Sequence, residues 1–331
     1  MKKKLLLMRK GLIWLLTSAI LLFTCFFAYP ALNSEQVRES KPHASILRLW
    51  HIDNFEGGIG SRGSFLVRCA RDFEKENCFI LMTEHTQESA EQALKDGNIP
   101  DLISFGTYFG EIAQYAQPLK DYRFEAAQMN GQTYAVPWCR GSYFLFSADG
   151  DFQDMTESNT VISVGKNALA DGCAYFSGMI GDFEHKTSLQ AYVSFMKGDY
   201  TYMLGTQRNL YRFATRNFEV QAKPLNEFCD LIQYICITAR ETTAYEAGVQ
   251  FVEYLLSESV QKTLDEIGML SMYTADIYGT ETAMSLAEKE CPKKMVNAFL
   301  AGEAKETIFE VARNAVSGDK ISAKNFENLF Q

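Results

Sequence analysis

The pattern of apolar and polar positions between residues 45 and 106 predicts five alternating elements. Three short apolar runs are typical of strands: "SILRLWHI" (residues 45–52), "CFILM" (78–82) and "IPDLISFG" (99–106). Residues 64–77 carry apolar side chains at helical spacing. A second helix follows from residue 87, with Thr86 as its candidate N-cap and Gly97 as its end. This β-α-β-α-β order predicts a parallel sheet with right-handed crossovers.

The apolar pattern weakens in the middle of the chain and returns near residue 224. Residues 149–197 hold short apolar runs among many glycines and aspartates, so we expect a smaller, irregular second lobe there. Residues 224–239 are predicted to be strand. Residues 242–257 have the period of an amphipathic helix, and another helix is predicted at 257–268. Because a chain of 331 residues exceeds the usual size of one compact core, we expect two lobes.

The first 32 residues differ from the rest of the chain. Five basic residues within the first ten precede an uncharged run at residues 11–32, which is long enough to span a bilayer. Basic residues on the N-terminal side direct the remainder of the chain outward. A retained anchor, a variant lipoprotein modified at Cys25 and a cleaved signal all remain open. Residues 33–44 are polar and are interpreted as a flexible tether.

Charge and cysteine content narrow the classes of partner. Beyond residue 32 the chain has 27 basic and 41 acidic side chains, a formal charge of −14, which argues against nucleic acid as a partner. Seven cysteines follow Cys25 without regular spacing, and the four histidines are scattered. We therefore expect buried free thiols rather than a disulfide framework, and we identify no metal site and no cofactor.

A glycine motif follows the first predicted strand. Gly58, Gly60 and Gly63 match G-x-G-x-x-G, and Glu84 lies where the dinucleotide fingerprint places an acidic residue. The fingerprint requires its turn directly after the strand, whereas "DNFEG" intervenes here. An exported chain also meets little nicotinamide cofactor. We therefore disfavour a dinucleotide site and retain the general expectation that backbone N–H groups at this helix start face a ligand.

Two further groups of residues have polar chemistry. Asp53 and Glu56 have the residue types of a catalytic carboxylate pair, although binding of hydroxyl groups or solvation of a turn explains them more simply. The stretch "MLGTQRNLYR" (residues 203–212) places Gln207 and Arg208 after an apolar strand end. It is either a capped surface helix or a turn that offers polar side chains to a cleft.

Five stretches, in order, resemble the solute-binding proteins of ABC importers, of the carbohydrate-binding type. They are "LWHIDNFEGGIGSRGSFL", "GNIPDLISFG", "GQTYAVPW", "MLGTQRNLYR" and "FVEYLLSESVQKTLDEIGML". The resemblance implies an α/β, two-lobed, periplasmic-binding-protein-like fold with hinge strands and a central ligand cleft. The part between residues 143 and 199 is shorter than is usual in that family, so the second lobe is expected to be reduced.

The resemblance also interprets the irregular run "GQTYAVPWCRGSYFLFS" (residues 131–147) as the first crossing between lobes. Pro137 removes a donor from the strand ladder and Gly141 relaxes the backbone. Trp138 then offers a flat face to a sugar ring, and Arg140 donates hydrogen bonds beside it. The alternative is that Trp138 is a core residue next to a bulge.

The resemblance leads to a complete set of expectations. Residues 45–141 and 224–285 form lobe one, and residues 142–223 and 286–331 form lobe two. The predicted ligand-binding residues are Asp53, Glu56, Arg62, Trp138, Arg140, Gln207 and Arg208, with no catalytic residue.

The implied function is that of a non-enzymatic receptor on the outer face of the membrane. It captures a sugar or similar polar solute for ABC permease subunits and is held by its N-terminal segment, or is secreted. The alternatives are a membrane-tethered sensor or adaptor of the same fold, and an extracellular carbohydrate-active enzyme.

Overall fold

The computed structural model divides the chain into two compact units, Met1–Ala44 and Ser45–Gln331. It describes residues 16–17, 46–74, 78–273, 276–279 and 282–330. The predicted export segment, apart from Leu16 and Thr17, and the predicted tether lie outside the described residues. Among the residues that are described, none belongs to a helix long and apolar enough to cross a membrane.

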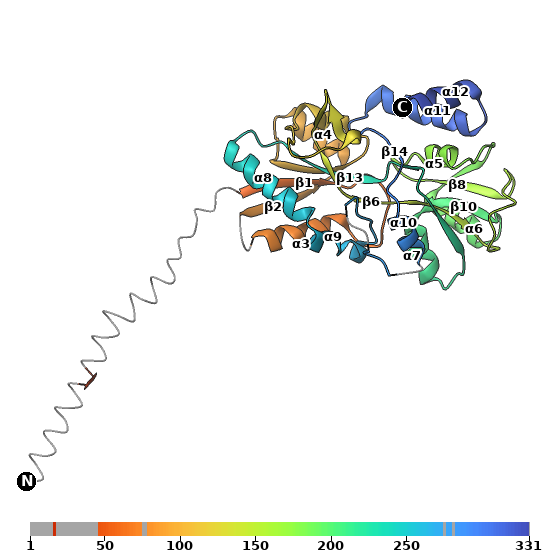
Figure 1. Cartoon of the computed structure of the whole chain (residues 1–331), viewed down its shortest axis with the longest axis horizontal. Coiled ribbons are helices and arrows are strands. Elements are labelled where there is room, and N and C mark those ends of the chain that lie inside the picture. Colours follow the sequence, from red (N-terminus) through yellow and green to blue (C-terminus); the bar gives the residue numbers. More distant parts are fainter. Residues whose placement is uncertain (1–15, 18–45, 75–77, 274–275, 280–281, 331) are drawn as a thin grey trace, which may run out of the picture. The chain divides into compact units, whose positions relative to one another are not determined.

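The first sheet of the second unit has five strands in the order β2-β1-β3-β13-β6 (Figure 1). Its strands are β1 (Ile46–Ile52), β2 (Phe79–His85), β3 (Leu102–Gly106), β6 (Val136–Arg140) and β13 (Ile232–Ile237). Strand β1 pairs in parallel with β2 and β3, whereas β13 runs antiparallel to β3 and β6. Helices α3 (Arg62–Glu74) and α4 (Gln87–Lys95) connect the parallel strands, which confirms the predicted β-α-β-α-β order.

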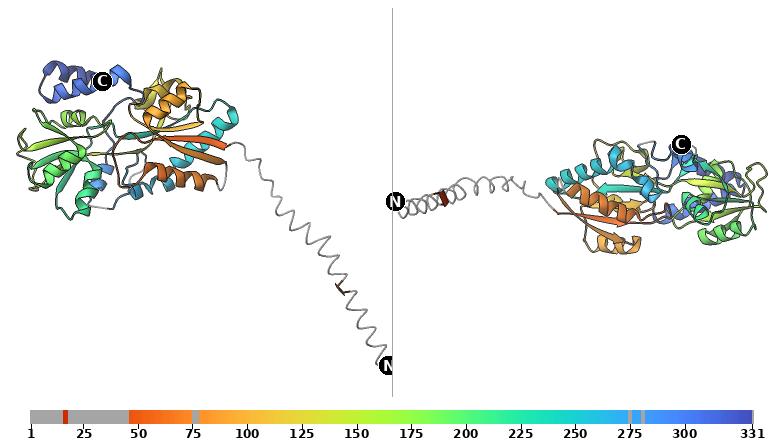
Figure 2. Two further views of the ribbon diagram at one scale, coloured as in Figure 1. Left: turned by 180° about the vertical axis from the view of Figure 1, so that it is seen from behind. Right: turned by 90° about the horizontal axis from the view of Figure 1, so that it is seen from below.

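The helices of this part form for the reasons that the sequence indicates. Helix α3 buries the predicted apolar face, which comprises Phe65, Leu66, Cys69, Ala70 and Phe73. Helix α4 begins at the predicted cap, because the Thr86 hydroxyl accepts a hydrogen bond from the Ser89 backbone N–H at 3.2 Å. Helix α8 (Thr242–Leu255) packs against α3 (Figure 2).

A second sheet follows with the order β11-β7-β10-β8-β9. Its strands are β7 (Tyr143–Ser147), β8 (Thr160–Val164), β9 (Glu184–Thr187), β10 (Tyr202–Thr206) and β11 (Gln221–Leu225). Strand β8 is parallel to β9 and β10, and β7 is antiparallel to β10 and β11. Helices α5 (Ala170–Phe176), α6 (Ser188–Met196) and α7 (Gln207–Thr215) accompany this sheet.

The middle of the chain is more regular than the sequence pattern indicated. Residues 149–197, which we expected to be irregular, contain β8, α5, β9 and α6. Strand β9 is an edge strand and none of its four residues is fully buried, so it lacks the apolar run by which strands are recognised. The glycines and aspartates of this segment lie mainly in the turns between its elements.

Two chain segments cross between the sheets, and they hydrogen-bond to each other. The first crossing runs from β6 to β7, and the return crossing runs from β11 to β13. The Gly141 N–H of the first crossing donates to the Leu231 carbonyl of the return crossing at 2.6 Å. A third segment joins them, because Arg140 and Leu270 exchange two backbone hydrogen bonds at 2.8 and 2.9 Å. The segments that connect the two sheets are therefore hydrogen-bonded to one another through their backbones.

The predicted irregularity around Pro137 is a β-bulge. The register between β6 and β13 shifts at Gln233 and Tyr234, and Pro137 pairs opposite Tyr234. The return crossing differs from the single strand predicted at residues 224–239. It is divided into the end of β11, the short β12 (Phe228–Cys229) and β13, because polar residues interrupt the apolar run.

The remaining elements pack around both sheets. They are η2 (Gly110–Gln114), η3 (Glu125–Ala127), β4 (Gln128–Met129), β5 (Gln132–Thr133), α9 (Glu258–Gln261), η4 (Leu264–Ile267), α10 (Ala283–Glu288), β14 (Lys294–Met295), α11 (Gly302–Val316) and α12 (Lys320–Asn328). Helix α11 packs on α5 of the second sheet. The Phe299 ring just before it lies 6.0 Å from the ring of Phe105 in β3. The C-terminal part therefore touches elements of both sheets.

The cysteines of the second unit are free thiols. Six of them are buried and one, Cys291, is exposed. Burial raises the pKa of the Cys69 thiol to about 12 and that of Cys229 to about 12. These cysteines therefore act as small apolar side chains of the core, as the sequence predicted.

Candidate functional site

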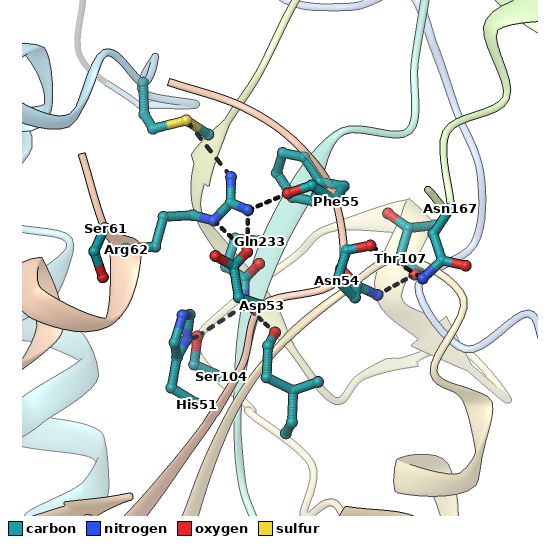
Figure 3. Close-up of polar contacts among 12 residues, drawn as sticks. His51, Asp53, Asn54, Phe55, Ser61, Arg62, Ser104, Thr107, Asn167 and Gln233 are labelled. Atoms are coloured by element: carbon teal, nitrogen blue, oxygen red, sulfur yellow. Dashed lines mark hydrogen bonds and ion pairs between the residues drawn. The ribbon is translucent and has the colours of Figure 1, made fainter. Parts of the chain in front are cut away.

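The carboxyl end of β1 carries the first group of predicted site residues (Figure 3). Asp53 follows β1 and accepts a hydrogen bond from Nε of Arg62 at 3.0 Å, with a second contact from Nη2. The Arg62 guanidinium also donates to the carbonyl of Phe55 and lies 3.9 Å from the centroid of the Phe55 ring. Arg62 is buried while half of the Asp53 side chain is exposed, so this pair fixes the loop that follows β1.

A buried polar cluster lies behind this loop. The Ser104 hydroxyl accepts hydrogen bonds from Nε1 of Trp138 at 3.0 Å and from Nε2 of Gln233 at 3.1 Å, and it lies 3.1 Å from Nδ1 of His51. With both lone pairs of the hydroxyl occupied, its proton faces Nδ1, which places the imidazole proton on Nε2. Burial lowers the pKa of His51 to about 4, so the ring is neutral near pH 7.

Trp138 belongs to this cluster and is fully buried. Its ring stacks on Phe65 of α3 with 5.6 Å between the ring centroids. In this structure the ring is therefore packed between protein side chains, which is the geometry of the core alternative. A contact between Trp138 and a ligand stays a prediction.

Arg140 and Gln207 lie where the chain crosses between the sheets, and both are buried. Nη2 of Arg140 donates to the carbonyl of Ala287 at 2.9 Å, which ties the crossing to the end of α10. Oε1 of Gln207 accepts from the Ser142 N–H at 2.9 Å, and its side chain lies against Gly141. A Cβ at Gly141 would stand 2.8 Å from Nε2 of Gln207, so close approach explains this glycine.

The ends of β1 and β8 meet directly through asparagine side chains. Nδ2 of Asn167, in the loop after β8, donates to the carbonyl of Asn54 at 3.0 Å, while Nδ2 of Asn54 donates to the carbonyl of Thr107 at 2.8 Å (Figure 3). Nζ of Lys305 in α11 completes the chain by donating to Oδ1 of Asn167 at 2.9 Å. The sequence interpretation missed all three side chains, because single asparagines and lysines in loops and helices carry no motif.

Asp230 is a second junction that the sequence interpretation missed. Its fully buried carboxylate accepts hydrogen bonds from the hydroxyls of Tyr108 at 2.8 Å and Tyr143 at 2.7 Å and from the Leu169 N–H at 2.7 Å. These donors follow β3, begin β7 and precede α5, so the carboxylate links elements of both sheets. Burial raises its pKa, and the three hydrogen bonds oppose that effect.

The glycine motif and the start of α7 form two walls of one cavity of about 370 Å³. The cavity is lined by Gly57–Gly60, Arg208, Tyr211, Arg212 and Thr215. Beside it, Oε2 of Glu56 lies 3.9 Å from Nη2 of Arg212. The structure thus brings Glu56 and Arg208 to one place. Trp138, Arg140 and Gln207 are buried and do not line this cavity, although the Gln207 side chain lies behind Gly57 of its wall.

The glycines themselves are required by packing. Gly58 has φ of +67°, and a Cβ there would stand 2.0 Å from the carbonyl oxygen of Ile267. A Cβ at Gly60 would stand 2.9 Å from Cγ2 of Ile267, and one at Gly63 would stand 2.0 Å from Oε1 of Glu84. Close contact with η4 and β2 therefore accounts for the spacing that resembles a dinucleotide fingerprint.

Comparison with known proteins places this geometry in a known fold. No model of a protein family matches the chain, and no curated protein matches it. Among solved structures, the maltose-maltodextrin binding protein of Alicyclobacillus acidocaldarius matches with a TM-score of 0.55 at 13% identity, covering 86% of this chain and 99% of that one. An ABC substrate-binding protein from Listeria monocytogenes, in complex with cycloalternan, matches at 0.56 and 12% identity over 86% and 96%. The chain has the two-lobed fold of ABC solute-binding proteins.

The expected fold class is thereby confirmed, although the likeness does not choose a ligand. Iron-bound HitA from Pseudomonas aeruginosa matches with a TM-score of 0.54 at 16% identity, over 82% of this chain and 99% of that one. The same fold therefore serves proteins with carbohydrate and with metal ligands. The ligand must be argued from the side chains of this chain.

Proposed function

We propose that this protein is an extracellular receptor that captures a sugar or a similar polar solute and passes it to the permease of an ABC importer. The observation that carries the proposal is the junction where the loop after β1 meets the loop after β8 and the start of α7. Each loop follows a strand of a different sheet, and the paired crossings join those sheets. Solutes of this fold class bind between two lobes that close by hinge motion.

The side chains at this junction suit recognition of hydroxyl groups. Asn54, Asn167 and Lys305 already form a hydrogen-bonded chain between elements of the two sheets. Glu56 and Arg208 add an acceptor and a donor near the neighbouring cavity. A polar solute that enters between the loops would exchange these contacts for its own at little net cost, because its hydroxyls are donors and acceptors as well.

Binding rather than catalysis is proposed. The acid pair considered in the sequence, Asp53 and Glu56, is divided in the structure, because Asp53 is held by Arg62 and Glu56 lies toward Arg212. Glycoside hydrolysis requires one protonated and one ionised carboxyl group on opposite sides of a bond. Within the described residues, the contacts of Asp53 and Glu56 are with different arginines, so the two acids do not act as such a pair.

The proposed location is the outer face of the membrane. The support is the uncharged run at residues 11–32 behind five basic residues, which directs the rest of the chain outward. The acidic exterior beyond it suits an aqueous compartment and does not suit nucleic acid. An ABC permease is included as the proposed partner because a receptor of this kind acts by delivering its solute to a permease.

A thermal-shift screen of the full-length chain against neutral sugars, acidic sugars, peptides and inorganic anions tests the proposal. A ligand that binds only the folded state stabilises it by about 2.7 kcal/mol at a concentration of 100 Kd. We expect at least one class of hydroxylated solute to raise the melting temperature. If every class leaves it unchanged while the protein melts cooperatively, the receptor function is contradicted and the sensor or adaptor alternative is favoured.

A further inference from the structure

The cavity between the loop after β1 and helix α7 has the size of a small-molecule site. Its volume of about 370 Å³ falls within the range of roughly 300–1,000 Å³ that is usual for ligand pockets. One wall is the backbone of Gly57–Gly60 and the other is one face of α7. Because β1 and β10 belong to different sheets, a ligand here would touch elements of both.

This cavity concentrates positive charge in an acidic protein. Arg208 and Arg212 lie one turn apart on α7 and both line it. Two like charges at this spacing destabilise a helix by a few tenths of a kcal/mol unless an anion lies between them. The Arg208 guanidinium makes no hydrogen bond or ion pair within the described part of the chain. Burial and the neighbouring Arg208 charge lower the pKa of Arg212.

Glu56 supplies too little negative charge to balance both arginines of the cavity. Glu56 approaches Arg212 at 3.9 Å, which is the outer limit of an ion pair, and Oε2 of Glu56 is buried without a hydrogen-bond partner in the described structure. The nearby Arg62, by contrast, is fully matched by Asp53. One carboxylate at the edge of the cavity therefore faces two guanidinium groups.

We propose that this cavity binds the acidic group of a hydroxylated small molecule, a uronate or a sugar phosphate, between Arg208 and Arg212. The proposal rests on the receptor function and narrows its ligand class. Guanidinium groups bind carboxylate and phosphate oxygens through two parallel N–H donors, which neutral sugars cannot match. Glu56 then accepts a ligand hydroxyl, which satisfies the oxygen that lacks a partner. Sulfate, which is fully deprotonated near neutral pH, has no hydroxyl to offer it.

Calorimetric titration of the full-length chain with matched ligand pairs tests the proposal. The pairs are galacturonate with galactose and glucose 6-phosphate with glucose, and inorganic sulfate serves as the anion without a hydroxyl group. We expect at least one acidic ligand to bind ten-fold or more tightly than its neutral partner and than sulfate. Raising the salt concentration from 50 to about 300 mM should weaken that binding several-fold, since partly exposed charges are screened.

Substitutions on α7 provide the matched control. Arg208→Gln and Arg212→Gln should each weaken binding of the acidic ligand ten-fold or more. Arg216→Gln removes an exposed charge from the C-cap of α7, outside the cavity, and should leave binding unchanged. Melting curves of the three variants show whether each is folded.

The possible outcomes separate this inference from the receptor function. Neutral sugars that bind as tightly as acidic ones, with no effect of Arg208→Gln, would overturn the inference and leave the receptor function standing. Sulfate that binds as tightly as both acidic sugars would overturn the role of the hydroxyl groups. A third outcome is that none of these ligands binds while the thermal screen finds a neutral or peptide solute. That result would overturn the proposal of an acidic ligand and leave the receptor function standing.

Discussion

His51 shows how a single residue can be fixed by its surroundings in the first sheet. The imidazole is buried, and Ser104 accepts from Trp138 and Gln233 while facing its Nδ1. A protonated ring would carry a buried charge, and within the described residues no carboxylate is hydrogen-bonded to it. The residue is therefore stable as a neutral group that orients a polar cluster within an apolar sheet.

The first prediction is a loss of stability in acid that depends on His51. The folded protein lowers the pKa of His51 from about 6.5 to about 4, so the unfolded chain takes up this proton first as the pH falls. Above pH 6.5 the ring is neutral in both states, and between pH 6.5 and about 4 the unfolding free energy should fall by about 3 kcal/mol. Urea unfolding at several pH values measures it.

The variant His51→Gln isolates this contribution from the carboxylates that titrate in the same range. The stability difference between the native protein and His51→Gln should shrink as the pH falls from 6.5 to 4. A difference that stays constant across this range would show that His51 does not resist protonation in the folded state.

The second prediction concerns Trp138. Its ring is fully buried against Phe65, so Trp138→Ala should cost about 3–5 kcal/mol of unfolding free energy by leaving a cavity and removing one hydrogen-bond donor to Ser104. Trp138→Phe keeps most of the ring and should cost less. Denaturant unfolding and ligand titration of both variants measure the two effects. An unchanged stability with ligand affinity lost would return Trp138 to the binding site.

At the scale of secondary-structure elements, Asp230 lies between β12 and β13 and accepts hydrogen bonds from residues after β3, in β7 and before α5. The third prediction is that Asp230→Ala costs about 3–5 kcal/mol, because the hydroxyls of Tyr108 and Tyr143 and the Leu169 N–H lose a common acceptor. Asp230→Asn keeps one oxygen and should cost about 1–2 kcal/mol.

Asp154→Asn, which changes an exposed carboxylate near the second sheet, is the control for Asp230 and should leave stability within about 0.5 kcal/mol. Thermal or denaturant unfolding near pH 7 compares the variants. If Asp230→Ala unfolds as the native protein does, the carboxylate does not hold the crossing elements together.

The order of elements in the first sheet could be predicted from sequence because its signals are local. Alternation, helical spacing and the Thr86 cap place β1, α3, β2, α4 and β3. The regular elements within residues 149–197 were not predicted, because an edge strand such as β9 has no apolar run. The division into residues 45–141 with 224–285 and 142–223 with 286–331, and the reduced size of the second lobe, stay predictions.

The candidate site was predictable in its segments and less so in its residues. The glycine motif and residues 203–212 do meet, at the cavity lined by Arg208. Trp138 and Arg140 were predicted to contact the ligand because a flat ring and a guanidinium suit sugar binding. The same side chains also suit a packed core and a buried hydrogen-bond donor, and the residue type alone does not distinguish the two roles. Asn54 and Asp230 act through partners that are 53 to 122 residues away in sequence, which no local pattern contains.

Among the described residues of the second unit, several polar connections join elements of the two sheets. They include the paired backbones at Gly141 and Leu231, the Asp230 carboxylate, and the chain from Asn54 through Asn167 to Lys305. The first two lie at the crossings, and the third links the loops after β1 and β8 to α11. This arrangement suits the proposed receptor, in which the crossings would act as a hinge and the loop contacts would exchange with a solute.

A crystal structure of the chain with the solute found by thermal screening tests this view of the molecule most directly. We predict that the solute lies between the loop after β1 and the start of α7, in contact with Arg208 and with at least one residue of 53–60. The Asp230 hydrogen bonds should be retained in that complex. A solute bound to elements of one sheet alone, or far from both loops, would contradict the proposal that this chain captures its ligand between two lobes.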